Sequence, residues 1–434
     1  MSLSNALARG VSLIGGAASR LRRFRDGSYE PAWGNAPTIP TAKPQGRIMT
    51  LKMPSARGWS PGQLPVAAPG LKVNAFATGL DHPRWLHVLP NGDVLVAESS
   101  GEPRKVMRHL FDHAMTATMK RARAAGVSAN RITLLRDTDG DGVAETCEPF
   151  LTGLSQPFGM ALVEDKFYVG NTDGIVVFPY AEGTTRIAGP GRKLVDFKPG
   201  GHWTRSLLVS TDGTKLYAGV GSLSNIGDDG MAVEEGRAAV YELELASGAS
   251  RIFASGLRNP VGLAWEPSTN VLWTVVNERD GLGDETPPDY LTSVQDGGFY
   301  GWPYSYWGQT VDDRVPQDAA AVARAITPDY ALGGHTASLG LCWMPAGTLP
   351  SFPDGMAIGQ HGSWNRSTLS GYKLVFVPFE NGRPCGPARD ILSGFLAPDE
   401  SVSYGRPVGV TLGPNKSLLM ADDVGNVVWR VTGA

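Results

Sequence analysis

A degenerate repeat constrains the fold of this chain more than any other feature. The clearest copies join Gly-Leu, two polar residues and Pro to an apolar run, as in Gly79-Leu-Asp-His-Pro83. Six units begin near Phe76, Phe150, Arg205, Phe253, Gly340 and Ile391. They fill residues 71–434 at about 60 residues each, and repeats of roughly 40–50 residues or more with four strands apiece are typical of β-propellers. The repeat therefore predicts an all-β fold, a six-bladed β-propeller.

The composition agrees with many short strands. The 434 residues include 55 Gly and 32 Pro, and only 19% are charged, which indicates frequent turns. Alternating apolar residues in the C-terminal segment Val427 to Val431 predict a strand that pairs with the first blade and closes the ring. A segment from Met107 to Ala125 has a helical pattern, and we expect a short helical insertion there.

Residues 1–70 form an irregular leader ahead of the propeller, which covers 71–434. Residues 1–28 carry five arginines around a short apolar run broken by Gly15 and Gly16. That run is too short to span a bilayer and is a poor match to a signal peptide. Two interpretations stay open: a basic amphipathic helix on a membrane surface, or a disordered leader. Residues 29–70 are rich in Pro and Ala and predict an extended lead-in.

Charge and cysteine content exclude several classes of function. The formal net charge of −3 argues against nucleic acid as a partner. Cys147, Cys342 and Cys385 are widely spaced and form no zinc or covalent haem motif, and a disulfide framework is not expected.

Polar residues recur at one point of the repeats. They are His82, Gln156, His202 with Arg205, Arg258 with Asn259, His335 and Arg406. Because the loops before the innermost strands of a propeller converge at one mouth, we expect a cationic funnel that suits an anionic ligand with several carboxylates. Taken singly, each of these residues could instead be a structural corner of its turn.

Four strings resemble a known family. They are Gly201-His202-Trp-Thr-Arg205, Gly256-Leu-Arg258-Asn259-Pro260-Val-Gly262, Asn277-Glu278-Arg279-Asp280 and Gly297-Gly-Phe-Tyr-Gly-Trp-Pro303. Together they resemble the soluble quinoprotein sugar dehydrogenases, and L-sorbosone dehydrogenases among them. The resemblance implies pyrroloquinoline quinone (PQQ) and a calcium ion at the propeller mouth, a sugar or aldehyde substrate, an external electron acceptor, and a periplasmic or secreted location.

The same resemblance assigns roles to individual residues. It implies that His202 is the general base and that Arg258 lies beside the reactive carbonyl. The expected cofactor contacts are Arg205, Asn225, Asn259, His335, Arg366 and Arg406. Glu278 and Asp280 fall where the family's calcium-binding turn lies. The chain departs from the glucose enzymes at Gly201 and Val261 and lacks a clear counterpart of their cofactor-binding lysine, for which His361 or Arg366 is the nearest cationic substitute.

A second calcium-like pattern lies at Asp137 to Glu148. Asp137, Asp139, Asp141 and Glu148, with Gly142 at the sixth position, fit the spacing of an EF-hand loop. The flanking segments read as strands and not helices, so the loop is either a structural calcium site or a hairpin whose Asp and Gly residues serve the turn.

Two other functions fit a six-bladed ring. A calcium-dependent lactonase would need Glu, Asn and Asp pointing into the channel, whereas this mouth is rich in Arg and His. A propeller that only binds proteins would not need His and Arg aligned in its repeats.

Overall fold

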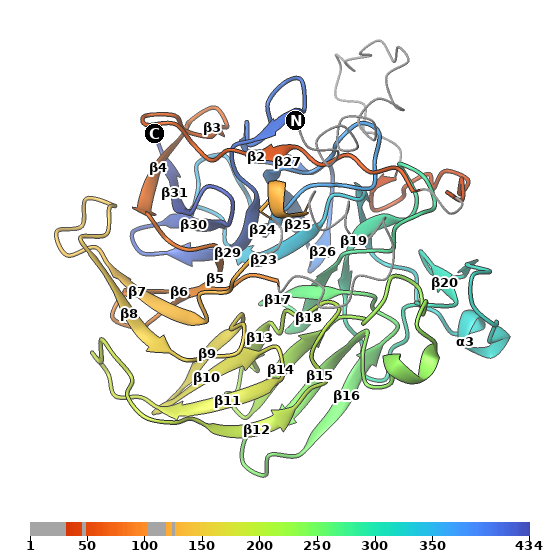
Figure 1. Ribbon diagram of the computed structural model, residues 1–434, viewed down its shortest axis with the longest axis horizontal. Helices are drawn as coiled ribbons and strands as arrows, with labels where there is room; N and C mark the ends of the chain where they lie inside the picture. The colour runs from red at the N-terminus through yellow and green to blue at the C-terminus, as the bar shows by residue number, and fades with distance from the viewer. Residues whose placement is uncertain (1–31, 46–48, 102–118, 124–125) are drawn as a thin grey trace, which may run out of the picture.

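The computed structural model describes residues 32–45, 49–101, 119–123 and 126–434. Within them, six antiparallel sheets follow one another in chain order around a common centre (Figure 1). Each sheet has four blade strands, and two sheets gain a further short strand at the outer edge. The predicted six-bladed β-propeller is confirmed.

The first three blades come from consecutive strands. The first holds β5 (Pro83–Val88), β6 (Val94–Glu98), β7 (Arg131–Arg136) and β8 (Thr146–Thr152). The second holds β9 (Met160–Val163), β10 (Lys166–Asn171), β11 (Gly174–Pro179) and β12 (Arg192–Asp196). The third holds β13 (Leu207–Val209), β14 (Lys215–Val220), β15 (Ala239–Glu244) and β16 (Ser250–Ser255).

The last three blades carry insertions or take strands from elsewhere. The fourth holds β17 (Pro260–Glu266), β18 (Val271–Val276), β19 (Pro288–Ser293) and β22 (Tyr330–Gly334). The fifth holds β23 (Ser338–Met344), β24 (Gly355–Gln360), β25 (Lys373–Glu380) and β27 (Arg389–Ser393). The sixth holds β29 (Pro407–Gly413), β30 (Ser417–Asp422), β31 (Val427–Gly433) and β4 (Leu71–Thr78).

The ring is closed by the two ends of the propeller. β31 pairs antiparallel with β4 along its whole length, from Val427 opposite Thr78 to Gly433 opposite Leu71. The expectation that the C-terminal strand seals the ring is confirmed, with one correction. Its partner β4 belongs to the last blade as its outermost strand, because the chain crosses into the first blade only after β4.

The six innermost strands are β5, β9, β13, β17, β23 and β29, and each contacts the inner strand of the next blade around the ring. Three of them begin at the proline of the repeat, namely Pro83, Pro260 and Pro407. Proline fixes its own φ and disfavours a helical conformation for the residue before it, so in these three blades the repeat ends a loop and starts a strand at the same point. Apolar clusters between neighbouring blades form the core.

The lead-in is extended where the structure describes it, and it is attached to the propeller by short strands. β1 (Trp33–Gly34) pairs with β22, β3 (Val66–Ala67) with β27, and β2 (Ser55–Ala56) runs parallel to β28 (Val402–Ser403). The fully buried Asn365 provides a further attachment. Its Oδ1 accepts from Gly281 N (2.8 Å), and its Nδ2 donates to Thr50 O (2.7 Å) and Gln45 Oε1 (3.0 Å).

Helix is scarce in the described residues. It comprises the 3₁₀ turn η1 (Met231–Glu234), α3 (Ala319–Ala323) and residues 119–121. Most of the predicted helical insertion lies outside the described residues, as do residues 1–31 and the two interpretations proposed for them. Small hairpin strands β20 (Ser305–Tyr306), β21 (Thr310–Val311) and β26 (Arg383–Pro384) complete the list. None of the helices in the described part of the chain is long and apolar enough to cross a membrane.

Candidate active site

The polar residues of the repeat gather at one end of the ring. They lie in the loops that lead into the inner strands, His82 before β5, His202 before β13 and Arg406 before β29. Three of the polar residues take a left-handed backbone, with φ of 57° at His82, 47° at Gln156 and 56° at His335. Non-glycine residues rarely adopt this conformation, and it turns the chain sharply just before the strand.

His202 is held with one ring nitrogen bound and the other free. Its Nδ1 lies 2.8 Å from Ser222 O, and its backbone N donates to the same carbonyl at 3.0 Å. Because a carbonyl only accepts, Nδ1 carries the hydrogen, and Nε2 keeps a lone pair that takes no hydrogen bond from the described residues. Burial, together with the charge of Arg258, lowers the pKa of His202 to about 3. The imidazole is therefore a neutral base at physiological pH.

Two buried arginines support the loop that carries His202. Arg205 donates from Nη1 to His202 O and Thr204 O, both at 2.8 Å, and from Nη2 to Lys198 O at 3.1 Å. Arg237 donates to Gly221 O at 3.0 Å and to Lys198 O at 2.6 Å. We therefore remove Arg205 from the predicted cofactor contacts, because its terminal nitrogens are bound to the backbone and its side chain is fully buried.

Arg258, Asn225 and Asp280 form an interlocked group. Arg258 donates to Asn225 O at 3.1 Å and, through Nη2, to Asn225 Oδ1 at 3.0 Å. Asn225 Oδ1 also accepts from Asp280 N at 2.9 Å, and its Nδ2 donates to Asp280 O at 3.0 Å. Nη1 of the arginine donates to Glu278 O at 2.8 Å. Asn225 thus fixes the guanidinium and the acidic turn relative to each other, and the second hydrogen of its Nδ2 is left without an acceptor among the described residues.

His335 pairs with the carboxylate of Asp280. Its Nδ1 lies 3.3 Å from Asp280 Oδ1, and its Nε2 donates to Gly283 O at 2.8 Å. Burial opposes protonation of His335, but the carboxylate of Asp280 outweighs it and raises the histidine pKa. Likewise, burial opposes ionisation of Asp280, but His335 and Arg258 hold its pKa below the usual value. Both nitrogens of His335 have protein acceptors, so it positions Asp280 and leaves no nitrogen for a cofactor.

Glu278 is buried beside this group with few partners. Its Oε2 accepts from Arg279 N at 3.0 Å, and burial raises its pKa to about 7 against the charge of Arg258. A bound cation would favour the ionised form. Glu278 and Asp280, the predicted calcium ligands, do not belong to a group of three or more converging metal-binding side chains in the described residues.

Asn259 presents an unused amide next to His202. Its Oδ1 is buried without a hydrogen-bond partner. A Cβ added at Gly221 would lie 2.2 Å from that oxygen and 2.6 Å from His202 Cβ. Only glycine therefore fits between the two side chains, and the unpaired Asn259 Oδ1 next to His202 can accept a hydrogen bond from a ligand.

Arg406 and Arg366 differ in what they leave free. Arg406 donates from Nε to His361 O and from Nη2 to Gly362 O, both at 2.8 Å, and its Nη1 takes no acceptor from the described residues. Arg366 spends both terminal nitrogens on Glu285 and Asp284 and its Nε on Thr368 O at 2.6 Å. Arg406 therefore stays a predicted ligand contact with a donor left over, whereas Arg366 is committed to protein acceptors.

Sequence reasoning missed two charged residues at this mouth, Arg84 and Asp423. Arg84 Nη1 bonds Asp423 Oδ2, which also accepts from His361 Nε2 at 2.8 Å. The signal was present in the repeat: at the position of Arg84, the residue after the proline, the other copies carry the apolar Phe158, Val261 and Val408.

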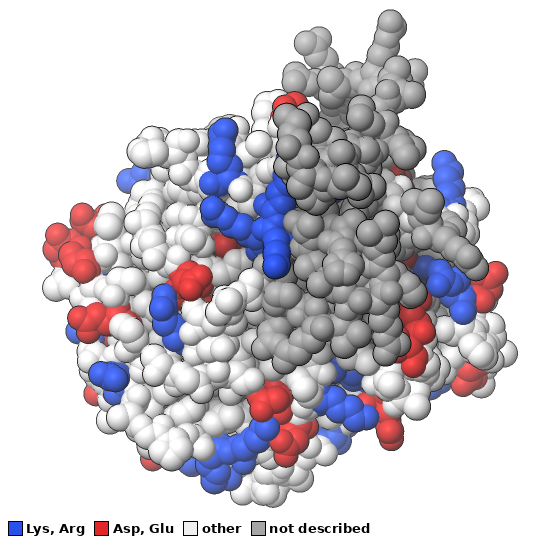
Figure 2. All heavy atoms as spheres, viewed as in Figure 1, with Lys and Arg blue, Asp and Glu red and all other residues white. Residues whose placement is uncertain are grey.

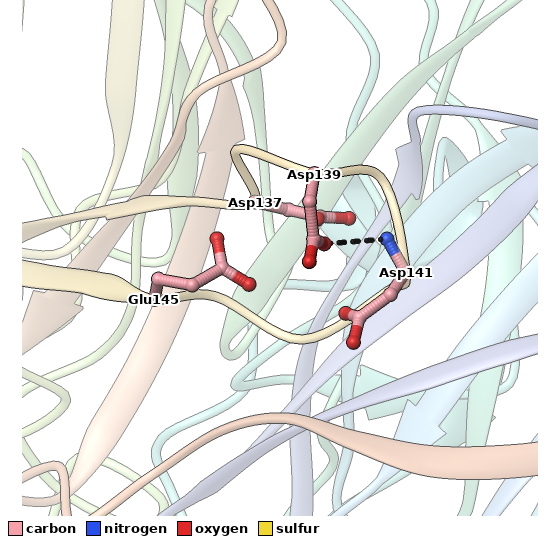
Figure 3. A group of neighbouring side chains, drawn as sticks. All are labelled: Asp137, Asp139, Asp141 and Glu145. Carbon is pink, nitrogen blue, oxygen red and sulfur yellow. Dashed lines mark hydrogen bonds between the residues drawn. The ribbon is translucent and has the colours of Figure 1, made fainter.

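The acidic loop at residues 137–145 lies apart from this mouth, between β7 and β8 (Figure 3). One carboxylate oxygen from each of Asp137, Asp139, Asp141 and Glu145 lies within 4.8 Å of the others. The predicted fourth ligand, Glu148, is wrong in this geometry, because it lies within β8 opposite Leu134, whereas Glu145 precedes the strand and faces the loop. Asp137 accepts from Gly140 N at 2.8 Å and Gly142 N at 3.0 Å, so the aspartates also shape the turn.

The outer face of the ring carries charge of both signs. Figure 2 shows Lys and Arg intermixed with Asp and Glu around the rim of the visible face, in keeping with the net charge of −3. The concentration of arginine and histidine described above belongs to the mouth and not to the surface in general.

Comparison with known proteins places this geometry in context. A family described as TrAA12-like matches residues 65–288 and 301–434. A pyrroloquinoline quinone-dependent sugar dehydrogenase of Hypocrea jecorina is 24% identical over 83% of this chain and 87% of its own.

Among solved structures, a Trichoderma reesei Carbohydrate-Active Enzymes Family AA12 structure gives a TM-score of 0.69 at 21% identity, covering 89% of this chain and all of that one. The holo form of the pyranose dehydrogenase PQQ domain from Coprinopsis cinerea gives 0.67 at 19% identity, covering 88% and 99%. At these identities the structural likeness supports the fold.

Proposed function

Because the chain belongs to the TrAA12-like family, we propose that it is a PQQ-dependent oxidoreductase that oxidises a sugar or a related aldehyde. One observation carries this proposal: a neutral histidine, His202, has an Nε2 that bonds to none of the described residues, and it lies close enough to the fixed guanidinium of Arg258 for that charge to lower its pKa. Base and cation side by side are what removal of a proton and a hydride requires.

The residues present fit an anionic quinone. Arg406 Nη1 has no acceptor among the described residues, whereas the buried and unpaired Asn259 Oδ1 can only accept a hydrogen bond from a donor on a ligand. An anionic ligand would supply that acceptor, and its charge would raise the pKa of His202 from about 3 toward the range where a general base works best.

Each side chain has a defined task. His202 Nε2 accepts the proton of the substrate hydroxyl, while its Nδ1–H stays bound to Ser222 O and fixes the ring. Arg258, immobilised by Asn225, stabilises negative charge that develops beside it. When bound, PQQ supplies the electrophilic carbon that accepts the hydride. Protein dipoles and charges that are already in place need no rearrangement as the reaction proceeds.

Calcium is proposed at two places. At the mouth, Asp280 and Glu278 are too few for an ion that takes six to eight oxygens, so carbonyl groups and the cofactor's own oxygens would complete the shell. In the loop between β7 and β8, Asp137, Asp139, Asp141 and Glu145 supply a separate structural site.

The substrate class rests on relatives. Sugar and pyranose dehydrogenases among them support an aldose or pyranose, and the motif resemblance extends this to a sorbosone-like sugar or aldehyde. The electrons would pass to an external acceptor.

The test is direct. Purified protein freed of cofactor is incubated with PQQ and calcium, and reduction of a dye is followed with a panel of aldoses and aldehydes. We expect reduction that requires protein, PQQ and substrate together. Protein that binds PQQ and reduces no dye with any of them, but hydrolyses a lactone, would replace the proposal with the lactonase alternative. Protein that binds no PQQ would overturn it outright.

A further inference from the structure

We infer that Arg84, held in place by Asp423, is a carboxylate-binding residue at the centre of the mouth, and that with Arg406 it forms a subsite for one carboxylate group of the anionic cofactor. This inference rests on the proposed function. It adds two residues to the site, because Arg84 and Asp423 are not among the site residues that were predicted from the sequence.

The contacts of Arg84 place it near the axis of the ring. It is the second residue of β5 in the first blade, yet its guanidinium carbon lies 5.9 Å from the ring centroid of Phe158 and 5.5 Å from that of Trp203, which precede the second and third blades. Its Nη1 lies 3.5 Å from His361 Nε2 of the fifth blade and bonds Asp423 of the sixth. A side chain can meet four other blades only from close to the centre.

Asp423 is the anchor of this arrangement. It is 1% exposed and accepts from Arg84 and from His361 Nε2, with His82 Nε2 at 3.4 Å. Burial alone would raise the pKa of Asp423, but His361, His82 and Arg84 hold it far below its usual range. Burial, aided by Arg406, lowers the pKa of His361 to about 3, so this ring is neutral at pH 7 and donates its hydrogen to the carboxylate.

The cluster carries more positive than negative charge. Arg84 and Arg406 are guanidinium ions, Asp423 is the only carboxylate among the described residues that pairs with either guanidinium, and His82 and His361 have lowered pKa values. Asp422 lies beside them and accepts from the backbone N of Arg406 at 2.8 Å, and burial raises its pKa to about 6. Arg84 Nε is buried without a partner, and its Nη2 donates no hydrogen bond to the described residues. Arg406 Nη1 likewise has no acceptor within the described part of the chain. Desolvated cations with unused donors are costly unless an anion completes them, and a carboxylate matches the planar fork of a guanidinium.

A purely structural role would look different. The same position in other repeats holds Phe158, Val261 and Val408, all at most 1% exposed, so an apolar residue suffices to pack the blade here. Arg84 instead places a buried charge here, which is paired with the buried Asp423; this aspartate in turn contacts His361 and His82. Its unused donors are what remains for a ligand.

The experiment measures cofactor binding and not turnover. Cofactor-free wild type, Arg84→Met, Arg84→Lys and a control, Arg136→Met, are titrated with PQQ and with its uncharged trimethyl ester by fluorescence quenching. Arg136 forms an ion pair with Asp93 on the outer part of the same blade, so its loss controls for removal of an arginine elsewhere. Urea unfolding of each variant is followed in parallel.

We expect Arg84→Met to weaken PQQ binding roughly 10- to 100-fold, as loss of hydrogen bonds to a charged group does, and to change ester binding less than 3-fold. Arg84→Lys, which keeps the charge toward Asp423 but not the fork, should lose about 10-fold for PQQ and keep the fold even where the methionine variant does not. Unchanged PQQ affinity, or equal losses for PQQ and the ester, would overturn the inference. Wild type that binds neither probe would instead refute the proposed function.

Discussion

Gly221→Ala adds one methyl group between the two side chains that define the reacting end of the site. The new Cβ would lie 2.2 Å from Asn259 Oδ1 and 2.6 Å from His202 Cβ, whereas real Cβ contacts start near 3.0 Å. At least one of these side chains must therefore move by about 1 Å. Overpacking of this kind costs roughly 1–3 kcal/mol of stability, and a 1 Å displacement of a catalytic group can lower the rate about 100-fold.

The assay is dye reduction by protein loaded with PQQ and calcium, with urea unfolding alongside. We expect turnover to fall about 100-fold in a variant that remains folded, with no ionisable group altered. Gly126→Ala is the control, because its added Cβ would lie 3.7 Å from Ser100 Oγ, an ordinary contact. Wild-type turnover in folded Gly221→Ala would refute the assignment of His202 and Asn259 to the reacting centre.

Four further outcomes are expected. His202→Ala should lower turnover roughly 10²–10⁴-fold while PQQ still binds; near-normal turnover would remove His202 from the role of base. In the unloaded protein the His202 ring should show no NMR titration between pH 5 and 8, since its pKa is about 3, and because the unfolded chain takes that proton near pH 6.5, this residue lowers stability as the pH falls below 6.5. Asn365→Asp replaces the Nδ2 that donates to Thr50 O and Gln45 Oε1 by an oxygen that can only accept. The free energy of unfolding in urea should fall by about 2–4 kcal/mol, and protease should cleave the lead-in faster; unchanged cleavage of the lead-in would contradict this. Asp139→Asn should weaken calcium binding to the loop in calorimetry at least 10-fold and spare dye reduction, and an unchanged isotherm would make the loop a plain turn.

The sequence predicted the ring because the signal was local and repeated. Gly-Leu, two polar residues and Pro ends one loop and starts one inner strand at Pro83 and Pro260, and a looser copy, Gly405-Arg-Pro407, does so at Pro407. The same register indicated which residues would converge, and the structure brings His202 and Arg258 together at one mouth. The six-bladed ring and the convergence of these loops at one mouth could therefore be predicted from the sequence alone, because both depend on the repeat.

The roles of individual arginines could not be read in this way. Whether a guanidinium faces a ligand or the backbone depends on which carbonyls other loops bring to it. Arg205 and Arg366 proved to be committed to protein acceptors, whereas Arg84 proved to keep unused donors. These outcomes arise from long-range folding that no motif records.

The error at Glu148 has a local cause. The predicted spacing is that of an EF-hand loop, which lies between two helices and whose twelfth residue coordinates the calcium ion. Here the loop joins two strands of a hairpin, and the chain enters β8 at Thr146. Glu145 is therefore the last side chain able to turn inward, and Glu148 is exposed on the strand.

The pairing of β31 with β4 has a consequence for biosynthesis. β4 leaves the ribosome before any blade exists, and the strand that covers it, β31, is made about 350 residues later. Until β31 is made, β4 remains an open edge that can pair with a neighbouring chain. Loss of β31 alone would therefore leave this edge exposed even though five blades are complete, and we expect such a chain to aggregate.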